Sequence, residues 1–330
     1  MEYLAQFWHI TYTVIGPIIV MVGAGYLVGR RVAQAAAVLA KVLLYLLIPV
    51  YVFQRVLNSS LAREEYGSII LFSALMLAVL YVMARLVSRA RRHDPPLRGA
   101  FINTAILYNS ANFAIPVMAL AFSADATQQT YAVAVQVVVA TCQGLAAYTV
   151  GAFNAAAGSG PVRHAMKGIF RLPFIYALAV ALIFKHFGMG GPEIEALAGQ
   201  SMLAKVAYGV LAEPMKYLSG AYVPIALMTL GAQMASVKLT PAPLDLALST
   251  VLRLVAGPLV GLALVKILGI EGQLAWVLVI GASGPTAIAS AVVAIEFKNR
   301  PDFAASAVFL STLGAGLTVP LVIFLVRAFL

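Results

Sequence analysis

The sequence predicts an all-α integral membrane protein in which ten transmembrane helices form two inverted repeats of five helices. Three observations support this prediction. Of the 330 residues, 62% are hydrophobic and only 10% are charged, at a mean hydropathy of +0.95, whereas an ordinary soluble domain has roughly 25% charged residues. Apolar runs of about 20 residues, which suffice to cross a bilayer, recur along the whole chain. Prolines interrupt these runs at similar spacings in the two halves.

The lengths of the apolar runs define the predicted spans and repeats. We expect the first repeat at residues 1–151, a cytoplasmic linker at 152–171 and the second repeat at 172–330. Residues 191–213 carry several polar side chains, so we expect a loop that bears an interfacial helix. No basic stretch precedes the first run, which indicates a retained helix and not a cleaved signal peptide. The predicted spans are 6–29, 32–57, 67–88, 98–122, 127–151, 172–190, 211–236, 244–267, 272–296 and 303–328.

The Lys and Arg residues between the spans predict the orientation in the membrane. Basic residues concentrate in cytoplasmic connections, and one set of alternate connections has thirteen of them, whereas the other has seven. We therefore expect a multi-pass protein of the cell (inner) membrane with both termini extracytoplasmic. The net charge of +10 follows from these short clusters, so no nucleic-acid partner is predicted. The larger set is Arg30, Arg31, Arg85, Arg89, Arg91, Arg92, Arg98, Arg163, Lys167, Arg171, Lys238, Lys298 and Arg300; the smaller is Arg55, Arg63, Lys185, Lys205, Lys216, Lys266 and Arg327.

Proline positions indicate that the chain is doubled. Pro49 lies in the second span and Pro116 lies 67 residues later, in the fourth; Pro224 lies in the seventh and Pro285 lies 61 residues later, in the ninth. Because each half has an odd number of helices, two copies of one fold must insert in opposite orientations. Interrupted helices at matching places in inverted repeats are the best sequence indicator of a transporter's binding site.

The fourth span contains the first predicted break, in "ILYNSANFAIPVMALAF" (106–122). It places Asn109, Ser110 and Asn112 within one helical turn, with Pro116 close behind. Asparagine is costly in hydrocarbon, and proline removes a backbone donor. A helix broken at this depth must line a cavity or be buried in protein, and its new N-terminus suits an anion. We therefore expect Asn109 and Asn112 to bind substrate, or alternatively to satisfy the broken backbone.

The ninth span contains the second predicted break, in "GASGPTAIASAVVAIEF" (281–297). Gly284 and Pro285 weaken the helix, and Ser283 and Thr286 offer hydroxyl groups for a substrate or for the preceding turn. If the two breaks cross, a polar site forms at the bilayer centre, with Pro116, Gly284 and Pro285 at the crossover.

Four other polar residues within the spans have two interpretations each. Gln136 and Gln143 lie seven residues apart on one helical face, where they either line the transport path or join helices. Arg253 either pairs with an anionic substrate or extends to the surface. Glu296 serves as a gate or forms an interfacial salt bridge with its basic neighbours.

The chemistry of an enzyme is not indicated. Cys142 is the only cysteine, and the four histidines lack the spacing of metal ligands. The stretch "GASGP" lacks the second glycine of a nucleophile elbow. We therefore predict no metal, no cofactor and no enzymatic activity.

Five stretches resemble the auxin efflux carrier family, which comprises PIN-type carriers and their bacterial relatives within the bile-acid/auxin type of inverted-repeat transporters. The resemblance covers nearly the whole chain, in the family's order. Thr286 stands where plant carriers usually have Gln, Asn112 stands where bacterial relatives tend to have Gly, and the third span lacks the acidic residue of plant carriers. The stretches are "KVLLYLLIPVYVF" (41–53), "NSANFAIPV" (109–117), "VPIALMTLGAQMA" (223–235), "VLRLVAGPLV" (251–260) and "PTAIASAVVAIEFKNRPDFAASAVFLSTLGAGLTVPL" (285–321).

This resemblance implies crossed, broken fourth and ninth helices, and a scaffold and a transport domain each drawn from both repeats. It also implies elevator-type alternating access and a homodimer. The family's site residues correspond to Asn109, before Pro116, and to the positions that flank Pro285.

The expected function is secondary active transport of a small organic anion, an auxin-like aromatic acid or a dicarboxylate. We expect Asn109, Asn112, Ser283, Thr286 and Gln136 to bind it, and the coupling ion to be H⁺ or Na⁺. A sodium-coupled bile-acid-type symporter and a non-transporting ligand sensor are the alternatives.

Overall fold

The computed structural model describes residues 7–156, 173–199, 201–237 and 239–330. Within these ranges the chain is helical, without any extended strand, which confirms the all-α prediction. Five segments, marked η, are π-helical. The helices are η1 (Thr11–Ile15), α2 (Gly16–Arg31), α3 (Ala35–Val42), η2 (Leu43–Leu47), α4 (Ile48–Leu57), α5 (Arg63–Ala90), α6 (Pro95–Ile106), η3 (Ser110–Ala114), α7 (Ile115–Ala121), α8 (Ala126–Ala146), η4 (Ala147–Gly151), α9 (Ala152–Ala155), α11 (Pro173–His186), α12 (Gly191–Ala198), α13 (Met202–Met234), α14 (Pro243–Val251), η5 (Leu252–Ala256), α15 (Gly257–Ile267), α16 (Gly272–Ala282), α17 (Ile288–Glu296) and α18 (Pro301–Phe329).

Six continuous helical stretches in the described part of the chain are long and apolar enough to cross a membrane. The fourth and ninth predicted spans are instead divided, into α6 with η3–α7 and into α16 with α17. The chain is therefore a multi-pass membrane protein, whereas ten spans and an inverted repeat remain predictions. The six stretches are Phe7–Arg31, Ala35–Leu57, Arg63–Ala90, Ala126–Ala155, Pro243–Ile267 and Pro301–Phe329.

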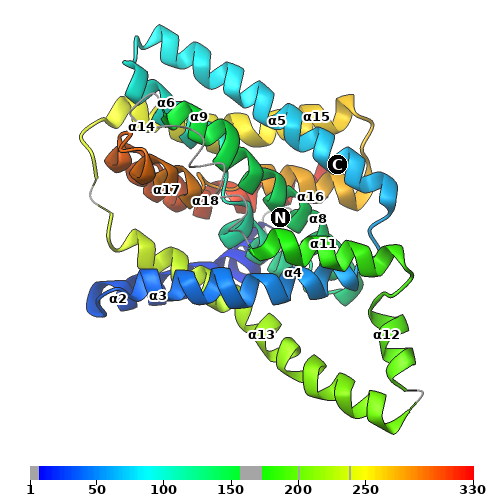
Figure 1. Cartoon of the computed structure of the whole chain (residues 1–330). Helices are drawn as coiled ribbons and strands as arrows, with labels where there is room; N and C mark the ends of the chain where they lie inside the picture. The colour runs from blue at the N-terminus through cyan, green and yellow to red at the C-terminus, as the bar shows by residue number, and fades with distance from the viewer. Residues whose placement is uncertain (1–6, 157–172, 200, 238) are drawn as a thin grey trace.

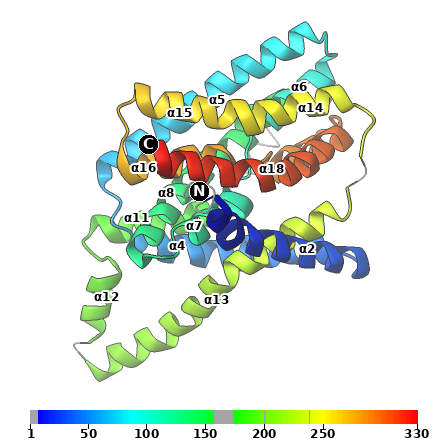
Figure 2. The same cartoon turned by 180° about the vertical axis from the view of Figure 1, so that it is seen from behind.

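The connection at 191–213 does bear a helix, α12. The rest of it is not a loop, however, because α13 already begins at Met202, nine residues before the predicted seventh span, and continues through Pro214 and Pro224. Figures 1 and 2 show α12 and the first part of α13 projecting from the body as a hairpin. Of the predicted linker 152–171, the first residues continue the fifth span as α9, and residues 157–171 lie outside the described ranges.

Most π-helical segments of the described chain are followed by a proline. Pro17, Pro49, Pro116 and Pro258 each stand two residues after the last residue of η1, η2, η3 and η5. A π turn contains one more residue than an α turn, so the widened turn gives the ring space where an α-helix would bring it against the carbonyl four residues back. These four prolines therefore follow π turns and do not end their helices.

The helices form two packed groups (Figures 1 and 2). The first group is α2, α3, α4, α11 and α13, in which α2 packs along α13 and α4 along α11. The second group is α5–α8 and α14–α18, and it contains both divided helices. The crossing of the divided helices lies where η3 of the second group contacts α13 of the first.

Glycines bring the backbones of α2 and α13 into contact. A Cβ atom added at Gly25 would lie 2.1 Å from the carbonyl oxygen of Met228, and one added at Gly231 would lie 1.9 Å from that of Val22. Gly25 and Gly29 form a G-x-x-x-G pair, which lets membrane helices approach closely.

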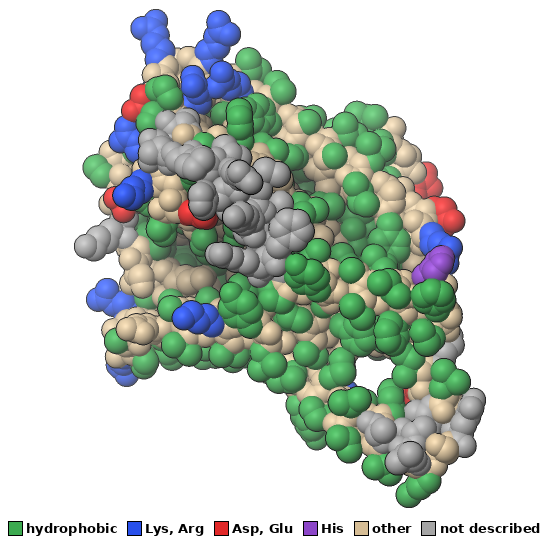
Figure 3. Space-filling model, in the orientation of Figure 1, with side chains coloured by type: hydrophobic (Ala, Val, Ile, Leu, Met, Phe, Trp, Pro, Cys, Tyr) green, Lys and Arg blue, Asp and Glu red, His purple; other side chains and the backbone are tan. Residues whose placement is uncertain are grey.

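Charged residues gather at one end of the molecule, where α5 ends and α6 begins (Figure 3). There Asp94 caps α6 through the N–H of Leu97 and pairs with Arg300 at 2.6 Å. The Leu97 N–H, followed by the Arg300 guanidinium, lowers the pKa of the Asp94 carboxyl below its ordinary value. Asp245 accepts from Arg91 at 3.0 Å. Of the larger basic set, Arg163, Lys167, Arg171 and Lys238 lie outside the described residues.

The substitution Gly25→Ala is expected to destabilise the first group, because the added methyl group overlaps the α13 backbone. The expected cost is about 1–3 kcal/mol, measured by unfolding of the purified protein in detergent. The control is Gly23→Ala on the same helix, since a Cβ at Gly23 meets no heavy atom within 4 Å. Equal stability of the two variants would show that α2 and α13 do not pack as described.

Candidate functional site

The two divided helices cross and pair through their backbones. Between α6 and η3 the chain is extended, and between α16 and α17 it turns, with an isolated antiparallel bridge joining the two segments. The Ala287 N–H donates to the carbonyl oxygen of Leu107 at 2.8 Å, and the Asn109 N–H donates to that of Pro285 at 2.7 Å. Each break therefore satisfies polar backbone groups of the other, as the predicted position at the bilayer centre would require.

The first break lies at Leu107–Asn109, seven residues before Pro116, so Pro116 is not at the crossover as we expected. Asn109 marks the new helix start, since its side-chain oxygen accepts the N–H of Asn112 at 3.1 Å. Pro116 lies in the first turn of α7. By the π-helical pattern its missing N–H leaves the Ala111 carbonyl free, and the Tyr222 hydroxyl donates to that oxygen at 3.0 Å. Pro285 does lie in the second break, beside Gly284.

Arg253 joins the C-terminal ends of the first halves of both divided helices. Its guanidinium donates to the carbonyl oxygen of Ala105 in α6 at 3.0 Å and to that of Ala282 in α16 at 2.5 Å. Its charge centre lies 4.8 Å from the centre of the Tyr108 ring. The side chain is 0% exposed, so it neither extends to the surface nor lines a cavity. Carbonyls at a helix C-terminus carry partial negative charge, and Arg253 offsets it at both ends.

The N-terminal ends of the second halves, η3 and α17, border a cavity of about 230 Å³. We call it the crossover cavity. α17 has no side-chain cap, and its first N–H groups have no intrahelical acceptor. The Asn109 side chain, 5% exposed, has an amide nitrogen without a hydrogen-bond partner. The lining residues are Ala40, Leu43, Leu44, Ile48, Leu107, Tyr108, Asn109, Ser110, Ala111, Asn112, Ala140, Gln143, Gly144, Tyr148, Phe174, Ala287, Ile288, Ala289 and Val292.

The lining of the crossover cavity is uncharged. Polar groups lie near the crossover, whereas the walls include Leu44, Phe174 and Val292. Within the described residues, the partial positive charges of the two helix N-termini face no carboxylate across this lining. The arrangement suits a small ligand with an anionic end and an apolar body.

Two predicted ligand-binding hydroxyls have structural partners instead. Thr286 Oγ1 donates to the carbonyl oxygen of Thr104 at 2.9 Å, and Ser283 Oγ donates to that of Ile280 at 2.6 Å. Both side chains are fully buried, and neither lines the crossover cavity. Of the predicted binding residues, Asn109 and Asn112 do line it.

The two glutamines of α8 form hydrogen bonds with backbone groups of the first break. Gln136 Nε2 donates to the carbonyl oxygen of Ser110 at 3.2 Å, and Gln143 Oε1 accepts the N–H of Tyr108 at the same distance. Gln136 is fully buried and does not line the crossover cavity, whereas Gln143 does. The interpretation of Gln136 as a helix-joining residue is therefore the one that the structure supports.

Glu296 lies exposed at the end of α17. Its basic neighbour Arg300 pairs with Asp94, and no ion pair of Glu296 occurs within the described ranges. Sequence reasoning also missed Tyr108 and Tyr148 as lining residues. The sequence signal for Tyr108 was its position directly before Asn109 in an apolar run. No comparable signal marks Tyr148.

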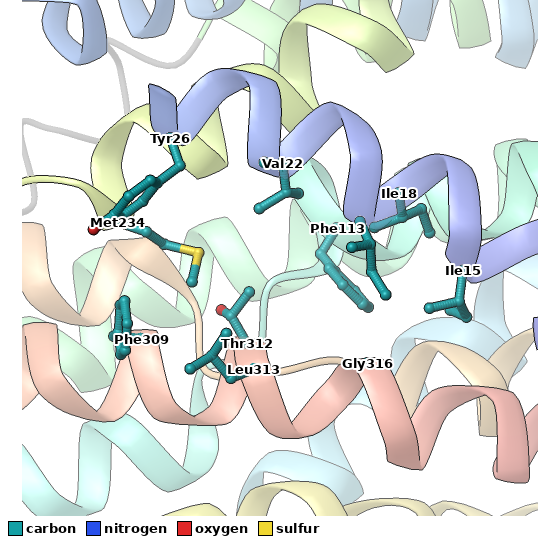
Figure 4. A pocket seen from close by; sticks show the side chains of 12 residues that line it. Ile15, Ile18, Val22, Tyr26, Phe113, Met234, Phe309, Thr312, Leu313 and Gly316 are labelled. Carbon is teal, nitrogen blue, oxygen red and sulfur yellow. The ribbon is translucent and has the colours of Figure 1, made fainter. Parts of the chain in front are cut away.

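A second, apolar cavity of about 420 Å³ separates the two groups of helices. Figure 4 shows side chains of α2, such as Ile18 and Val22, facing Phe309 and Leu313 of α18, with Phe113 of η3 between them. We call it the apolar cavity. The contact between the groups is therefore loosely packed and mostly apolar on this side of the crossover.

Comparisons with known proteins indicate a membrane transport protein. Residues 161–323 match the model of a family described as "Membrane transport protein", which is the auxin efflux carrier-type family that the sequence resembles. The matched residues, just under half of the chain, are similar to this membrane transport family. A relative from Methanothermobacter thermautotrophicus, described as an uncharacterized transporter, is 29% identical over 156 residues, which cover 47% of this chain and 46% of the relative. The matched part thus spans less than half of that relative's length. Family and relative both support a membrane transporter rather than an enzyme.

The substitution Thr286→Val is expected to destabilise the protein by about 1–3 kcal/mol, because the buried Thr104 carbonyl loses its donor. Unfolding in detergent measures the loss. Thr141→Val is the control, because Thr141 donates only to the carbonyl four residues back in its own helix. A Thr286 variant no less stable than the control would contradict the described hydrogen bond.

Proposed function

We propose that this protein is a secondary transporter that binds a small organic anion in the crossover cavity. The observation that supports this most is the segregation of helix ends. The C-terminal ends of α6 and α16 are joined by Arg253, whereas the N-terminal ends of η3 and α17 border the cavity. A carboxylate there would accept hydrogen bonds from free backbone N–H groups and from the Asn109 amide.

The size and walls of the cavity favour a compact monocarboxylate. Its volume of about 230 Å³ is below the roughly 300–1,000 Å³ of pockets for drug-sized ligands. One carboxylate fits the helix N-termini, and a flat apolar body fits against Leu44, Phe174 and Val292. A dicarboxylate would place its second charge against an uncharged wall, which is costly. An aromatic acid therefore suits the cavity better than a dicarboxylate.

The two groups of helices supply the parts of an alternating-access mechanism. The crossover cavity is lined by both groups, with Ala40 and Phe174 from the first and Asn109 and Ile288 from the second. We propose that the second group, which holds the crossover, slides against the first and brings the cavity to either membrane face. The basic end in Figure 3 would then be cytoplasmic, and a second copy of the chain would complete a homodimer.

The substitution Asn109→Asp tests the sign of the ligand's charge. The carboxylate still accepts the Asn112 N–H, so folding is retained, but a negative charge replaces the free amide donor. Uptake of aromatic monocarboxylates, such as indoleacetate or benzoate, into proteoliposomes is expected to fall about tenfold or more. A tenfold loss corresponds to about 1.4 kcal/mol, and two like charges about 4 Å apart repel by more than this at an effective dielectric constant of about 20.

The matched control for this experiment is Gln128→Glu. It adds the same charge in the exposed first turn of α8, outside the crossover cavity. Uptake by this variant is expected to equal that of the wild type. Normal uptake by both variants would remove Asn109 from the binding site.

Cross-linking tests the sliding motion. In a Cys142→Ser background, a Met234→Cys/Phe309→Cys pair joins α13 of the first group to α18 of the second across the apolar cavity (Figure 4). Thiol-specific linkers of graded length are expected to block uptake, and reduction of a cleavable linker to restore it. A Met234→Cys/Tyr26→Cys pair lies within the first group and serves as the control. Unimpaired uptake in the linked first pair would exclude the proposed motion.

A further inference from the structure

Four half-helix ends meet at the crossover, and two of them are negative. In membrane transporters, the C-terminal ends of half-helices and unwound carbonyls coordinate the coupling Na⁺ or H⁺. Here the corresponding carbonyls belong to Ala105 and Ala282, and both accept a hydrogen bond from the Arg253 guanidinium. Ala105 lies 148 residues and Ala282 lies 29 residues from Arg253 in the sequence. A permanently charged side chain thus lies where a bound cation would otherwise be held.

The chain makes specific room for this side chain. Arg253 lies in the π-helical segment η5, and a Cβ added at Gly257 would lie 2.2 Å from its Nη2 atom. The Tyr108 ring lies beside the guanidinium, a cation–π arrangement. Within the described residues no ion pair involves Arg253, so helix dipoles and an aromatic ring are its counter-charges there.

We propose that Arg253 is a resident cation of the crossover: a positioning residue that holds the C-terminal ends of α6 and α16 together and takes the place of a coupling metal ion. It keeps the two N-terminal ends aimed at the crossover cavity without touching the ligand. Its position does not depend on which ligand is carried; only the consequence for ion coupling rests on the proposed transport function.

The first experiment measures thermal stability in detergent as a function of the cation. The melting temperature of the wild type is expected to be the same in sodium, potassium and choline chloride. Arg253→Ala removes the charge and leaves two buried carbonyls without donors, so its melting temperature falls. Millimolar guanidinium is expected to raise the melting temperature of Arg253→Ala again, because the free ion can bind between the two carbonyls. If Arg253 only filled space, guanidinium would give no such rescue.

Arg327→Ala is the matched control. Arg327 donates to the carbonyl of Ala121, at the C-terminal end of α7, but it is partly exposed and away from the crossover. The control is expected to lose stability without rescue by guanidinium. Equal rescue of both variants, or no loss of stability in Arg253→Ala, would overturn the assignment. If Arg253→Ala does not fold, Arg253→Lys replaces it in the experiment. Its single ammonium group keeps the charge but cannot reproduce both hydrogen bonds, so its melting temperature is expected to lie below that of the wild type. A wild-type melting temperature for Arg253→Lys would overturn the proposal.

The second experiment measures uptake of indoleacetate in proteoliposomes with and without a sodium gradient. Unchanged uptake is expected, and a sodium-driven increase in uptake or in wild-type melting temperature would overturn the resident-cation role. Failure of the proteoliposomes to take up any carboxylate would count against the proposed function alone, since the stability measurements on Arg253 need no ligand.

Discussion

The structure depends on satisfying backbone polar groups at a depth where no water is available. Each interruption of a membrane helix frees N–H and carbonyl groups, and each unsatisfied group costs several kcal/mol in hydrocarbon. This chain meets the requirement by crossing its two interruptions, so that Leu107 pairs with Ala287 and Asn109 with Pro285. Side chains from other helices supply further partners, namely Arg253, Gln136, Gln143 and Ser311, and Thr286 of the second break donates to the end of α6. Neither break could be stable alone, and the pair is therefore one structural unit.

The same requirement separates charge at the crossover. The buried guanidinium satisfies the negative helix ends, whereas the positive ends border the crossover cavity, where the Asn109 side chain caps one of them. The proposed anion-binding site would then follow from the backbone, with Asn109 as the added side-chain donor. The cost of burying Arg253 is considerable, but two charge-assisted hydrogen bonds and the Tyr108 ring offset much of it. In the proposed site the helix macrodipoles, and no charged side chain of the lining, would select for an anionic ligand.

The sequence predicts the membrane class and both breaks because composition and run length are local properties. It also identifies Asn109, since an asparagine inside an apolar run is costly unless it caps a helix or binds a ligand. The placement of Pro116 at the crossover was wrong, because proline removes a donor but does not by itself end a helix. Here a π turn accommodates the ring, and the Tyr222 hydroxyl donates to the freed carbonyl. Arg253 and Thr286 could not be placed, because their partners lie far away in sequence. A hydroxyl near a break is consistent with both substrate binding and backbone support, and only the fold decides between them.

The contact between the two groups of helices is suited to movement. Apolar packing is non-directional, so one surface can slide over another while its area stays buried, and the apolar cavity lowers the number of interlocking contacts further. At the level of the crossover, the Tyr222 hydroxyl forms a directional bond to Ala111, and the Tyr222 ring stacks on Tyr51 at 4.2 Å within the first group. A single neutral hydrogen bond contributes about 1 kcal/mol net, which is small enough to break on each cycle. The crossover itself is held by charged and backbone bonds within the second group and would move as one body.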